Sequence, residues 1–159
     1  MALDALSEVL WHERSLLELL LFKLEEEQLL LTAGRSRWLA HATREVEAVL
    51  AEIRDAELGR SVEATAACAQ LGLPDGASLA EMADAAPAPW DDLLRRHREA
   101  FAALTAEISH LADGNRDLLA VSHRATQETL ASLDDTHTYD GSGRSGARES
   151  AALLVDRTL

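Results

Sequence analysis

Leucine recurs every seven residues at the start of the chain, and this spacing restricts the fold more than any other feature. Leucine occupies two positions of the heptad that are three and four residues apart. These leucines are Leu3, Leu6, Leu10, Leu17, Leu20, Leu24 and Leu31. Side chains at alternating three- and four-residue spacing share one face of an α-helix, so the pattern predicts a helix at about 3–32 with a buried seam. Leu16 and Leu30 widen the seam, which indicates contact with more than one partner surface. Glu13 and Glu27 fall at seam positions and weaken the helix as a simple dimer zipper.

Glycine and proline mark where the first two helices should end. Gly34 in "TAGRS" can end the first helix, and Ser36 can cap the next. The second helix is predicted at about 37–71, because Gly72 and Pro74 in "LGLPDG" stop it. Its apolar stripe comprises Leu39, Val46, Val49, Leu50, Ile53, Val62 and Ala66.

Two further helices follow. "SLAE" is a capping box of Ser78 and Glu81, and it predicts a short helix at about 79–86. "APAPWDD" opens a long helix at about 90–133, whose seam alternates spacings of four and three residues. The seam residues are Trp90, Leu94, His97, Phe101, Leu104, Ile108, Leu111, Asn115, Leu118, Ser122 and Ala125. Because His97 lies on this seam, it is expected to be a packed core histidine.

The predicted fold is therefore all-α: an elongated antiparallel three-helix bundle or coiled coil with a disordered C-terminal tail. The helical domain is expected at 1–133 and the flexible tail at 134–159. The tail sequence "DDTHTYDGSGRSGARES" has no periodicity and is rich in Gly and Ser, which disfavours a packed core. The only tyrosine, Tyr139, lies in this tail. A lone aromatic side chain on such a segment can enter a hydrophobic pocket of a partner.

Charge and cysteine content exclude several classes of function. The formal net charge is −13 with no basic stripe, which argues against a nucleic-acid partner and an anionic membrane surface. A membrane span needs about 18 consecutive apolar residues, and charged residues interrupt the apolar cluster "SLLELLLFKLEEEQLLL" before it reaches that length. Cys68 is the only cysteine, so no intramolecular disulfide can form. The N-terminus lacks the pattern of a secretory signal, so we expect a cytoplasmic protein without membrane insertion.

No arrangement of residues predicts catalysis, a cofactor or a metal site. Glu107 and His110 have the spacing used in di-metal bundles, but a second Glu-x-x-His motif is missing from the sequence. A phosphoryl-accepting histidine needs nearby cations, and His41 and His123 have arginine neighbours only at ordinary surface spacing. A helical enzyme or phosphorelay module that uses His41 or His123 stays open as an alternative.

Asn115 is the most informative polar residue, because it occupies a seam position in an otherwise apolar helix. A buried asparagine can fix helix register at some cost in stability. Alternatively, this part of the helix lies at the edge of the bundle, where the asparagine clasps a bound peptide. Beyond Leu119 the seam thins, while Leu118, Leu119, Leu130 and Leu133 leave apolar patches. Either the first helix covers these patches, or they receive a partner's amphipathic helix.

Several stretches together point to a known family. They are "EEQLLLTAG" at the end of a leucine-rich first helix, the following "RSRWLAHATREVEAVL", "NRDLL" late in the last helix and "TYDGSGR" in the tail. In order and spacing the chain resembles the FlgN-type flagellar export chaperones over about residues 3–144. The loop "LGLPDGASLAEMADAAPAPW" departs from the family pattern, and the tail beyond Gly143 has no clear counterpart.

The resemblance implies a cytoplasmic chaperone without catalytic residues, cofactor or metal. Such a chaperone binds the C-terminal helix of flagellar hook-associated (hook–filament junction) proteins, its clients. It prevents their premature association and delivers them to the flagellar type III export gate. Carried over by motif, Asn115, Leu118 and Leu119 lie in the client-binding region, with Leu130 and Leu133 as extensions. Tyr139 corresponds to the tail tyrosine that engages the export gate.

Other interpretations of the helical pattern stay open. A coiled-coil adaptor or oligomeric scaffold unrelated to flagella explains the heptads equally well, but it leaves the tail tyrosine unexplained. A homodimer of the client-free protein, which hides the patch around Leu118 and Leu133, is compatible with the same pattern. The sequence does not indicate which hook-associated protein is bound.

Overall fold

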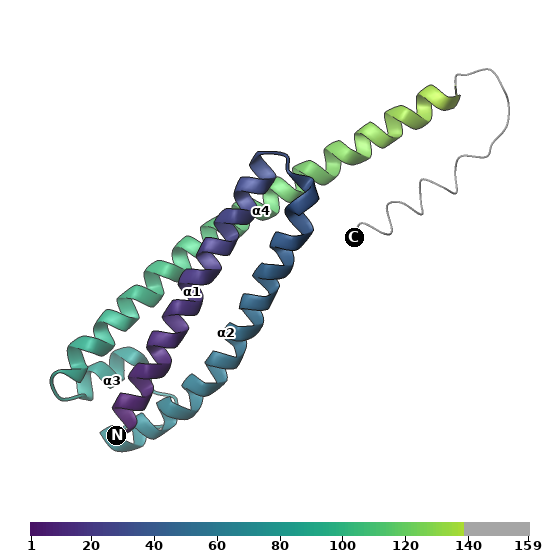
Figure 1. The fold of residues 1–159 in the computed structure, drawn as a ribbon. Helices are drawn as coiled ribbons and strands as arrows, with labels where there is room; N and C mark the ends of the chain where they lie inside the picture. Colours follow the sequence, from purple (N-terminus) through teal and green to yellow (C-terminus); the bar gives the residue numbers. More distant parts are fainter. Residues whose placement is uncertain (139–159) are drawn as a thin grey trace. The chain divides into compact units, whose positions relative to one another are not determined.

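The computed structural model describes residues 1–138, with side chains placed for residues 1–135. These residues are all-α, as predicted, and contain no strand; the helices are α1 (Ala2–Thr32), α2 (Ser36–Leu71), α3 (Leu79–Ala85) and α4 (Trp90–Thr138) (Figure 1). The bounds of the first three helices agree with the prediction to within one residue. α4 continues to Thr138 instead of ending at residue 133, because no glycine or proline interrupts the sequence between Asn115 and Gly141.

The chain divides into two compact units, and α4 contributes to both. One unit comprises Met1–Leu119 and the other Ala120–Leu159, of which the structure describes residues 120–138. The predicted division into a helical domain at 1–133 and a flexible tail at 134–159 stays a prediction, and Tyr139 lies outside the described residues. None of the helices in residues 1–138 combines the length and the apolar character that crossing a membrane requires.

Glycines in the left-handed conformation end the first two helices, as predicted. Gly34 (φ 66°) follows α1, and Gly72 (φ 70°) caps α2. After α1, the backbone N–H of Arg35 donates to the Leu30 carbonyl at 2.9 Å, and the same pattern closes α2. This geometry satisfies carbonyls that the helix itself leaves without partners, and glycine adopts it without a steric cost at Cβ.

The starts of the helices agree only partly with the prediction. Ser78 Oγ accepts from the Glu81 N–H at 3.2 Å, and the Glu81 carboxylate accepts from the Ser78 N–H at 2.7 Å, which confirms the capping box of α3. The prediction that Ser36 caps α2 is wrong, because Ser36 is the first helical residue and Arg35 holds the cap position without a side-chain bond. The bond from Arg35 to Leu30 already fixes this residue, so α2 begins directly after it.

Ion pairs show that α1 and α2 run antiparallel. Lys23 of α1 meets Glu45 of α2 at 2.9 Å, whereas the earlier Glu13 meets the later Arg60 at 3.2 Å. Glu13 is a seam position that is buried beside this arginine. Burial raises the pKa of Glu13, and the charge of Arg60 opposes that rise. The seam thus tolerates a carboxylate because a cation of the neighbouring helix reaches it.

Within Met1–Leu119, α4 runs parallel to α1. Trp11 lies against His97 with ring centroids 4.8 Å apart. Further along both helices, the Asn115 side chain donates to the Leu24 carbonyl at 2.9 Å. Later residues of α1 therefore meet later residues of α4, and α1, α2 and α4 alternate in direction along the chain.

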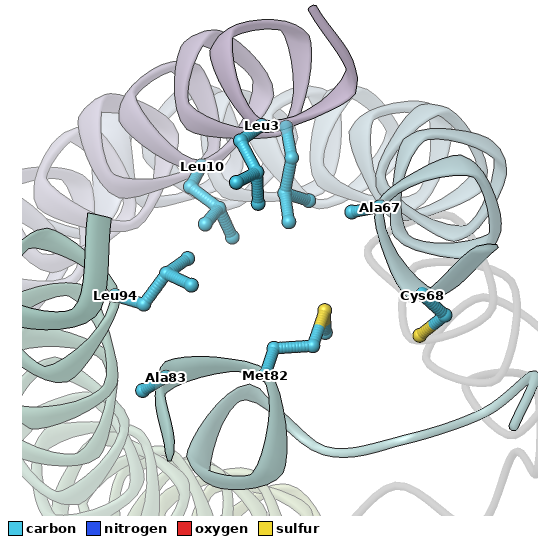
Figure 2. Close-up of a cluster of buried hydrophobic side chains, with 8 residues drawn as sticks. Leu3, Leu10, Ala67, Cys68, Met82, Ala83 and Leu94 are labelled. Atoms are coloured by element: carbon cyan, nitrogen blue, oxygen red, sulfur yellow. The ribbon is translucent and has the colours of Figure 1, made fainter. Parts of the chain in front are cut away.

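The unit Met1–Leu119 contains two apolar cores. All four helices contribute to the first, and Figure 2 shows their side chains converging; its buried members are Leu3, Leu6, Leu10, Ala67, Cys68, Met82, Ala83 and Leu94. α1 and α2 supply the buried members of the second, which are Leu16, Leu20, Leu24, Val46, Val49, Ile53 and Ala56. Ile108, Leu111 and Ala112 of α4 pack against this second core. The predicted long helices thus meet through the faces that their periodicity indicates.

The α1 seam is buried at most of its predicted positions. Those confirmed as buried are Leu3, Leu6, Leu10, Leu20 and Leu24. Leu17 and Leu31 are only half-buried, whereas Leu16 is buried. A straight α-helix rotates by about 20° per heptad relative to a strict seven-residue repeat, so the buried face shifts along α1.

The predicted stripe of α2 is wrong near its end, because Val62 and Ala66 are exposed. Val62 follows Ile53 by nine residues, which at about 100° per residue places it on the opposite face. Ala67 follows Ile53 by fourteen residues and therefore returns to nearly the same face, where it is buried in the first core.

Candidate functional site

The buried run of α4 ends at Asn115. Before that point the helix places Leu94 and His97 in the interior, whereas no side chain described between residues 116 and 135 is buried. Leu119 is half-buried. The other leucines predicted for the site are exposed: Leu118 by 36%, Leu130 by 38% and Leu133 by 56%.

Asn115 joins α4 to the other long helices through a buried carboxylate. It is 1% exposed, and its Nδ2 donates to the Leu24 carbonyl at 2.9 Å and to Glu27 Oε1 at 3.2 Å. Glu27 Oε2 accepts from Thr43 Oγ1 of α2 at 3.1 Å. Glu27, Thr43 and Asn115 therefore form a polar contact among three helices, here called the Glu27 clamp.

The Glu27 clamp bears on the two interpretations of Asn115. Both N–H groups of its amide are used inside the unit, so neither is left to clasp a peptide, and the contact supports the interpretation that Asn115 fixes register. Glu27 lies at a predicted seam position, but nothing in the sequence pattern identified Thr43 or Asn115 as its partners. A seam carboxylate and a seam asparagine on different helices were the only signal for this contact.

In the unit Ala120–Leu159, the described part of α4 is amphipathic. At about 100° per residue, Thr126, Leu130 and Leu133 fall on one side of the helix. Glu128 lies about 200° from Leu130, and Arg124 about 180° from Leu133, so these two charged residues take the opposite side. The exposed Val121 also lies opposite Leu130, and the exposed His123 lies on the side of Leu130, so the two sides are only partly separated. An exposed helix with one apolar and one charged side can pack its apolar side against a partner helix.

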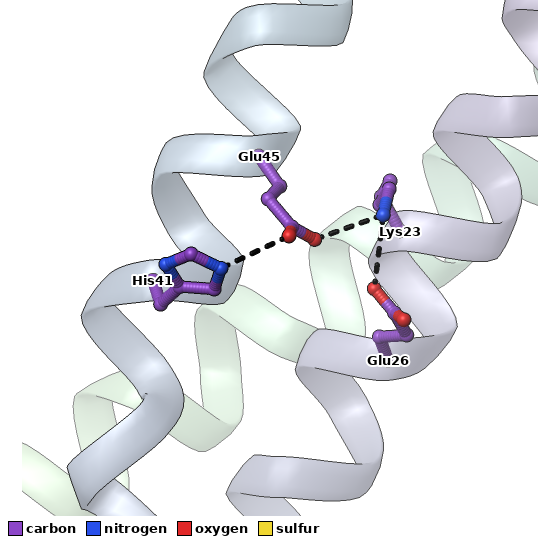
Figure 3. A network of polar contacts seen from close by, with 4 residues as sticks. All are labelled: Lys23, Glu26, His41 and Glu45. Atoms are coloured by element: carbon purple, nitrogen blue, oxygen red, sulfur yellow. Dashed lines mark hydrogen bonds and ion pairs between the residues drawn. The ribbon is translucent and has the colours of Figure 1, made fainter.

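The histidine weighed for phosphotransfer in α2 is engaged with a carboxylate. Figure 3 shows Glu45 between His41 Nε2 at 3.1 Å and Lys23 Nζ at 2.9 Å, and Lys23 also pairs with Glu26 at 3.5 Å. The hydrogen bond between Lys23 and Glu45 raises the pKa of Lys23 and lowers that of Glu45. A carboxylate beside His41 repels a phosphoryl group, so this geometry disfavours phosphotransfer there.

The other candidate groups for chemistry lie on the surface. Glu107, His110 and His123 are all exposed. Within residues 1–138, no three or more His, Cys, Asp and Glu side chains gather as the ligands of a metal ion would.

His97 is a core residue, as predicted. Its ring contacts Trp11 edge-on, and neither ring nitrogen has a hydrogen-bond partner in the protein. Burial, and to a smaller extent the charge of Arg14, lower the pKa of His97. The imidazole therefore serves as an aromatic packing element, and it places a titratable group in the interior.

Comparison with known families agrees with these features. The sequence model of the FlgN family, described as FlgN protein, matches residues 1–146. The chain belongs to the FlgN family. The match includes both "NRDLL" and "TYDGSGR", and it confirms the resemblance seen in the sequence. FlgN proteins are flagellar export chaperones and form a chaperone family, so the chain acts in flagellum assembly and protein export. No curated protein and no solved structure matched the chain.

Proposed function

We propose that this FlgN-family chain binds the C-terminal amphipathic helix of flagellar hook-associated proteins in the cytoplasm. It prevents their premature association and delivers them to the flagellar type III export gate. The observation that supports this most directly is the exposure of Leu118, Leu130 and Leu133 on a helix whose buried run ends at Asn115. Burying a fully exposed leucine side chain contributes about 1.5–3 kcal/mol. These leucines are 36–56% exposed, so a client helix that covers them gains a corresponding fraction of that value from each.

The proposed site residues have two kinds of role. Leu118 and Leu119 contact the start of the client helix, and Leu130 and Leu133 extend the contact along α4. Asn115 acts indirectly, because its amide is used by Leu24 and Glu27. It fixes α4 at residue 115 to α1 within the unit Met1–Leu119.

Delivery to the export gate is assigned to Tyr139. It follows the last described residue, Thr138, and lies within the part of the chain that the family match covers. A tyrosine suits such a contact, because its ring is apolar and its hydroxyl can stay solvated or bonded. Client and gate thus use different residues of the chain.

The scaffold alternative requires a free seam on α1 for a second chain. Leu6, Leu10 and Leu20 of that seam are buried by helices of the same chain, so the seam is already used. We therefore infer that Met1–Leu119 acts as an antiparallel three-helix bundle whose client surface lies on α4. A homodimer of the client-free protein through Leu118 and Leu133 would protect that same surface.

The test is calorimetric titration of the full chain with a peptide matching the C-terminal helix of a hook-associated protein from the same organism. Leu130→Asp combined with Leu133→Asp should raise the Kd at least about tenfold, because it places charge in an apolar contact. Leu58→Asp combined with Val62→Asp is the matched control. These two residues of α2 are at least as exposed, and the Kd of the control should change by less than about twofold.

Circular dichroism and sedimentation complete the test. Both variants must be as helical as the unmodified chain, and sedimentation reports whether the client-free chain is a monomer or a homodimer. Absence of binding by a folded, monomeric chain would refute client binding. Equal loss of affinity in the two variants would refute the assignment of the site to α4.

A further inference from the structure

Three large apolar side chains form a row on the side of α1 that faces solvent. Trp11, Phe22 and Leu29 are 51%, 54% and 69% exposed. They are separated by eleven and seven residues, so at about 100° per residue they lie within about 20° of one line along the helix. At a rise of about 1.5 Å per residue this row, here called the α1 row, is about 27 Å long. The α1 seam faces both cores from another side of the helix, and neither core includes a residue of the row. Trp11 also contacts the buried His97 ring of α4 with one edge, so Phe22 and Leu29 are the residues of the row that the test changes.

Carboxylates are interleaved with the α1 row. Asp4, Glu18 and Glu25 are exposed and fall within about 40° of the same line. Acidic and apolar side chains therefore alternate along one side of α1. This arrangement complements a helix that carries apolar residues flanked by lysine or arginine.

The two aromatic rings of the row already attract cations of this chain. The Arg14 guanidinium lies 4.3 Å from the centroid of the Trp11 ring, and the Lys23 ammonium lies 5.5 Å from that of Phe22. A positive group near the face of an aromatic ring is attracted by its quadrupole. The rings thus show the preference for positive charge that the interleaved carboxylates also give to this surface.

We propose that the α1 row is a second docking surface, which takes a basic amphipathic helix of a partner protein. A second copy of this chain is disfavoured as the occupant, because its acidic row would meet the same acidic row in a chain of net charge −13. The proposal goes beyond client binding, since the row uses α1 and the proposed client surface uses α4. It does not depend on whether the client assignment is correct.

The test uses a synthetic peptide of about 18 residues, long enough to cover the row, with leucines at helical spacing and lysines elsewhere. Two control peptides carry glutamate in place of lysine, or the same residues in scrambled order. The full chain carries Leu130→Asp and Leu133→Asp throughout, so that the apolar side of α4 does not compete. Affinity is measured by calorimetry, and circular dichroism checks that each variant is folded.

We expect the lysine peptide to bind and both control peptides to bind at least about tenfold more weakly. Phe22→Gln with Leu29→Gln should raise the Kd for the lysine peptide at least about tenfold, without any change of charge. The matched pair Leu58→Gln with Val62→Gln, at exposed positions of α2, should change it by less than about twofold. Glu18→Gln with Glu25→Gln should weaken binding and reduce its dependence on salt.

Three results would overturn the proposal. One is absence of binding, or equal loss in the α1 and α2 variants, which would show that the row is not a specific site. A second is a dimer of the unmodified chain that Phe22→Gln with Leu29→Gln converts to a monomer, which would make a second copy the occupant. The third is a gain of at least about tenfold in peptide affinity when the chain is ended at Thr138, which would show that residues 139–159 occupy the row.

Discussion

Removing the Asn115 amide should destabilise the chain, and removing the carboxylate as well should restore stability. Asn115→Leu deletes the bond to the Leu24 carbonyl, worth about 1 kcal/mol, and the bond to the Glu27 carboxylate, worth about 1.5–3 kcal/mol. The replacement also removes Asn115 Oδ1, which is buried without a protein partner, and this offsets about 1 kcal/mol of the loss. We therefore expect Asn115→Leu to lower the free energy of unfolding by about 1.5–3 kcal/mol.

The double variant Asn115→Leu with Glu27→Leu replaces both partners by apolar side chains of similar size. Because no buried charge is then left without its donor, the double variant should lie within about 1 kcal/mol of the unmodified chain. The second substitution should thus reverse most of the damage done by the first. Thr43 loses its acceptor, but it is only half-buried and can bond to water.

Urea unfolding followed by circular dichroism measures all four chains of this double-mutant cycle. The coupling energy between the two positions should be at least about 1.5 kcal/mol. If the effects of the single substitutions add to within about 0.5 kcal/mol, the Glu27 clamp is not an energetic unit and the reasoning is refuted. A fully stable Asn115→Leu variant would contradict it as well.

Two further predictions concern the interior. The pKa of His97 is lowered in the folded state, so below the ordinary histidine pKa of about 6.5 the unfolded state binds more protons than the folded state. The free energy of unfolding should therefore decrease by up to about 1.4 kcal/mol for each unit by which the pH is lowered in that range. His97→Phe should remove this contribution, and urea unfolding at about pH 7.5 and about pH 5.5 measures it. The same dependence of stability on pH in the unmodified chain and in His97→Phe would contradict the prediction. Leu6→Ala, at a fully buried position of the first core, should cost about 3–5 kcal/mol, whereas Leu58→Ala on the surface should cost less than about 0.5 kcal/mol. Similar urea midpoints for the two variants would refute this view of the core.

Features set by local chemistry could be predicted from the sequence. Gly34 and Gly72 adopt the left-handed conformation at the predicted helix ends, and Ser78 forms the predicted capping box. Each depends on a few neighbouring residues, so the signal is contained in a short stretch. The burial of His97 also followed from its place in a regular seam.

Features set by the geometry of a whole helix or turn were harder to predict. Val62 seemed to extend the α2 stripe, but its angle relative to Ile53 places it on the opposite face. Ser36 has the right residue type for a cap, but the turn that closes on Leu30 starts α2 one residue earlier. In both cases a correct local preference was overridden by the geometry of the whole helix or turn.

The candidate site shows the same limit. The exposed leucines of α4 were recognisable, because the seam thins beyond Leu119. The partners of Asn115 were not, because Glu27 is 88 residues away and Thr43 lies on a third helix. The spacing of apolar residues predicts the buried face of one helix. It does not predict which seam residues of different helices lie next to each other when the helices pack.

The Glu27 clamp also has a consequence for the order in which the chain is made. Thr43 follows Glu27 by 16 residues, whereas Asn115 follows it by 88. During synthesis, α1 and α2 can close as a hairpin well before the ribosome has released α4, because short loops close at lower entropic cost. The side of α1 that α4 later covers faces water throughout that interval. The nascent chain therefore passes through a stage in which the apolar side of α1 that α4 covers in the finished fold is still open to other chains.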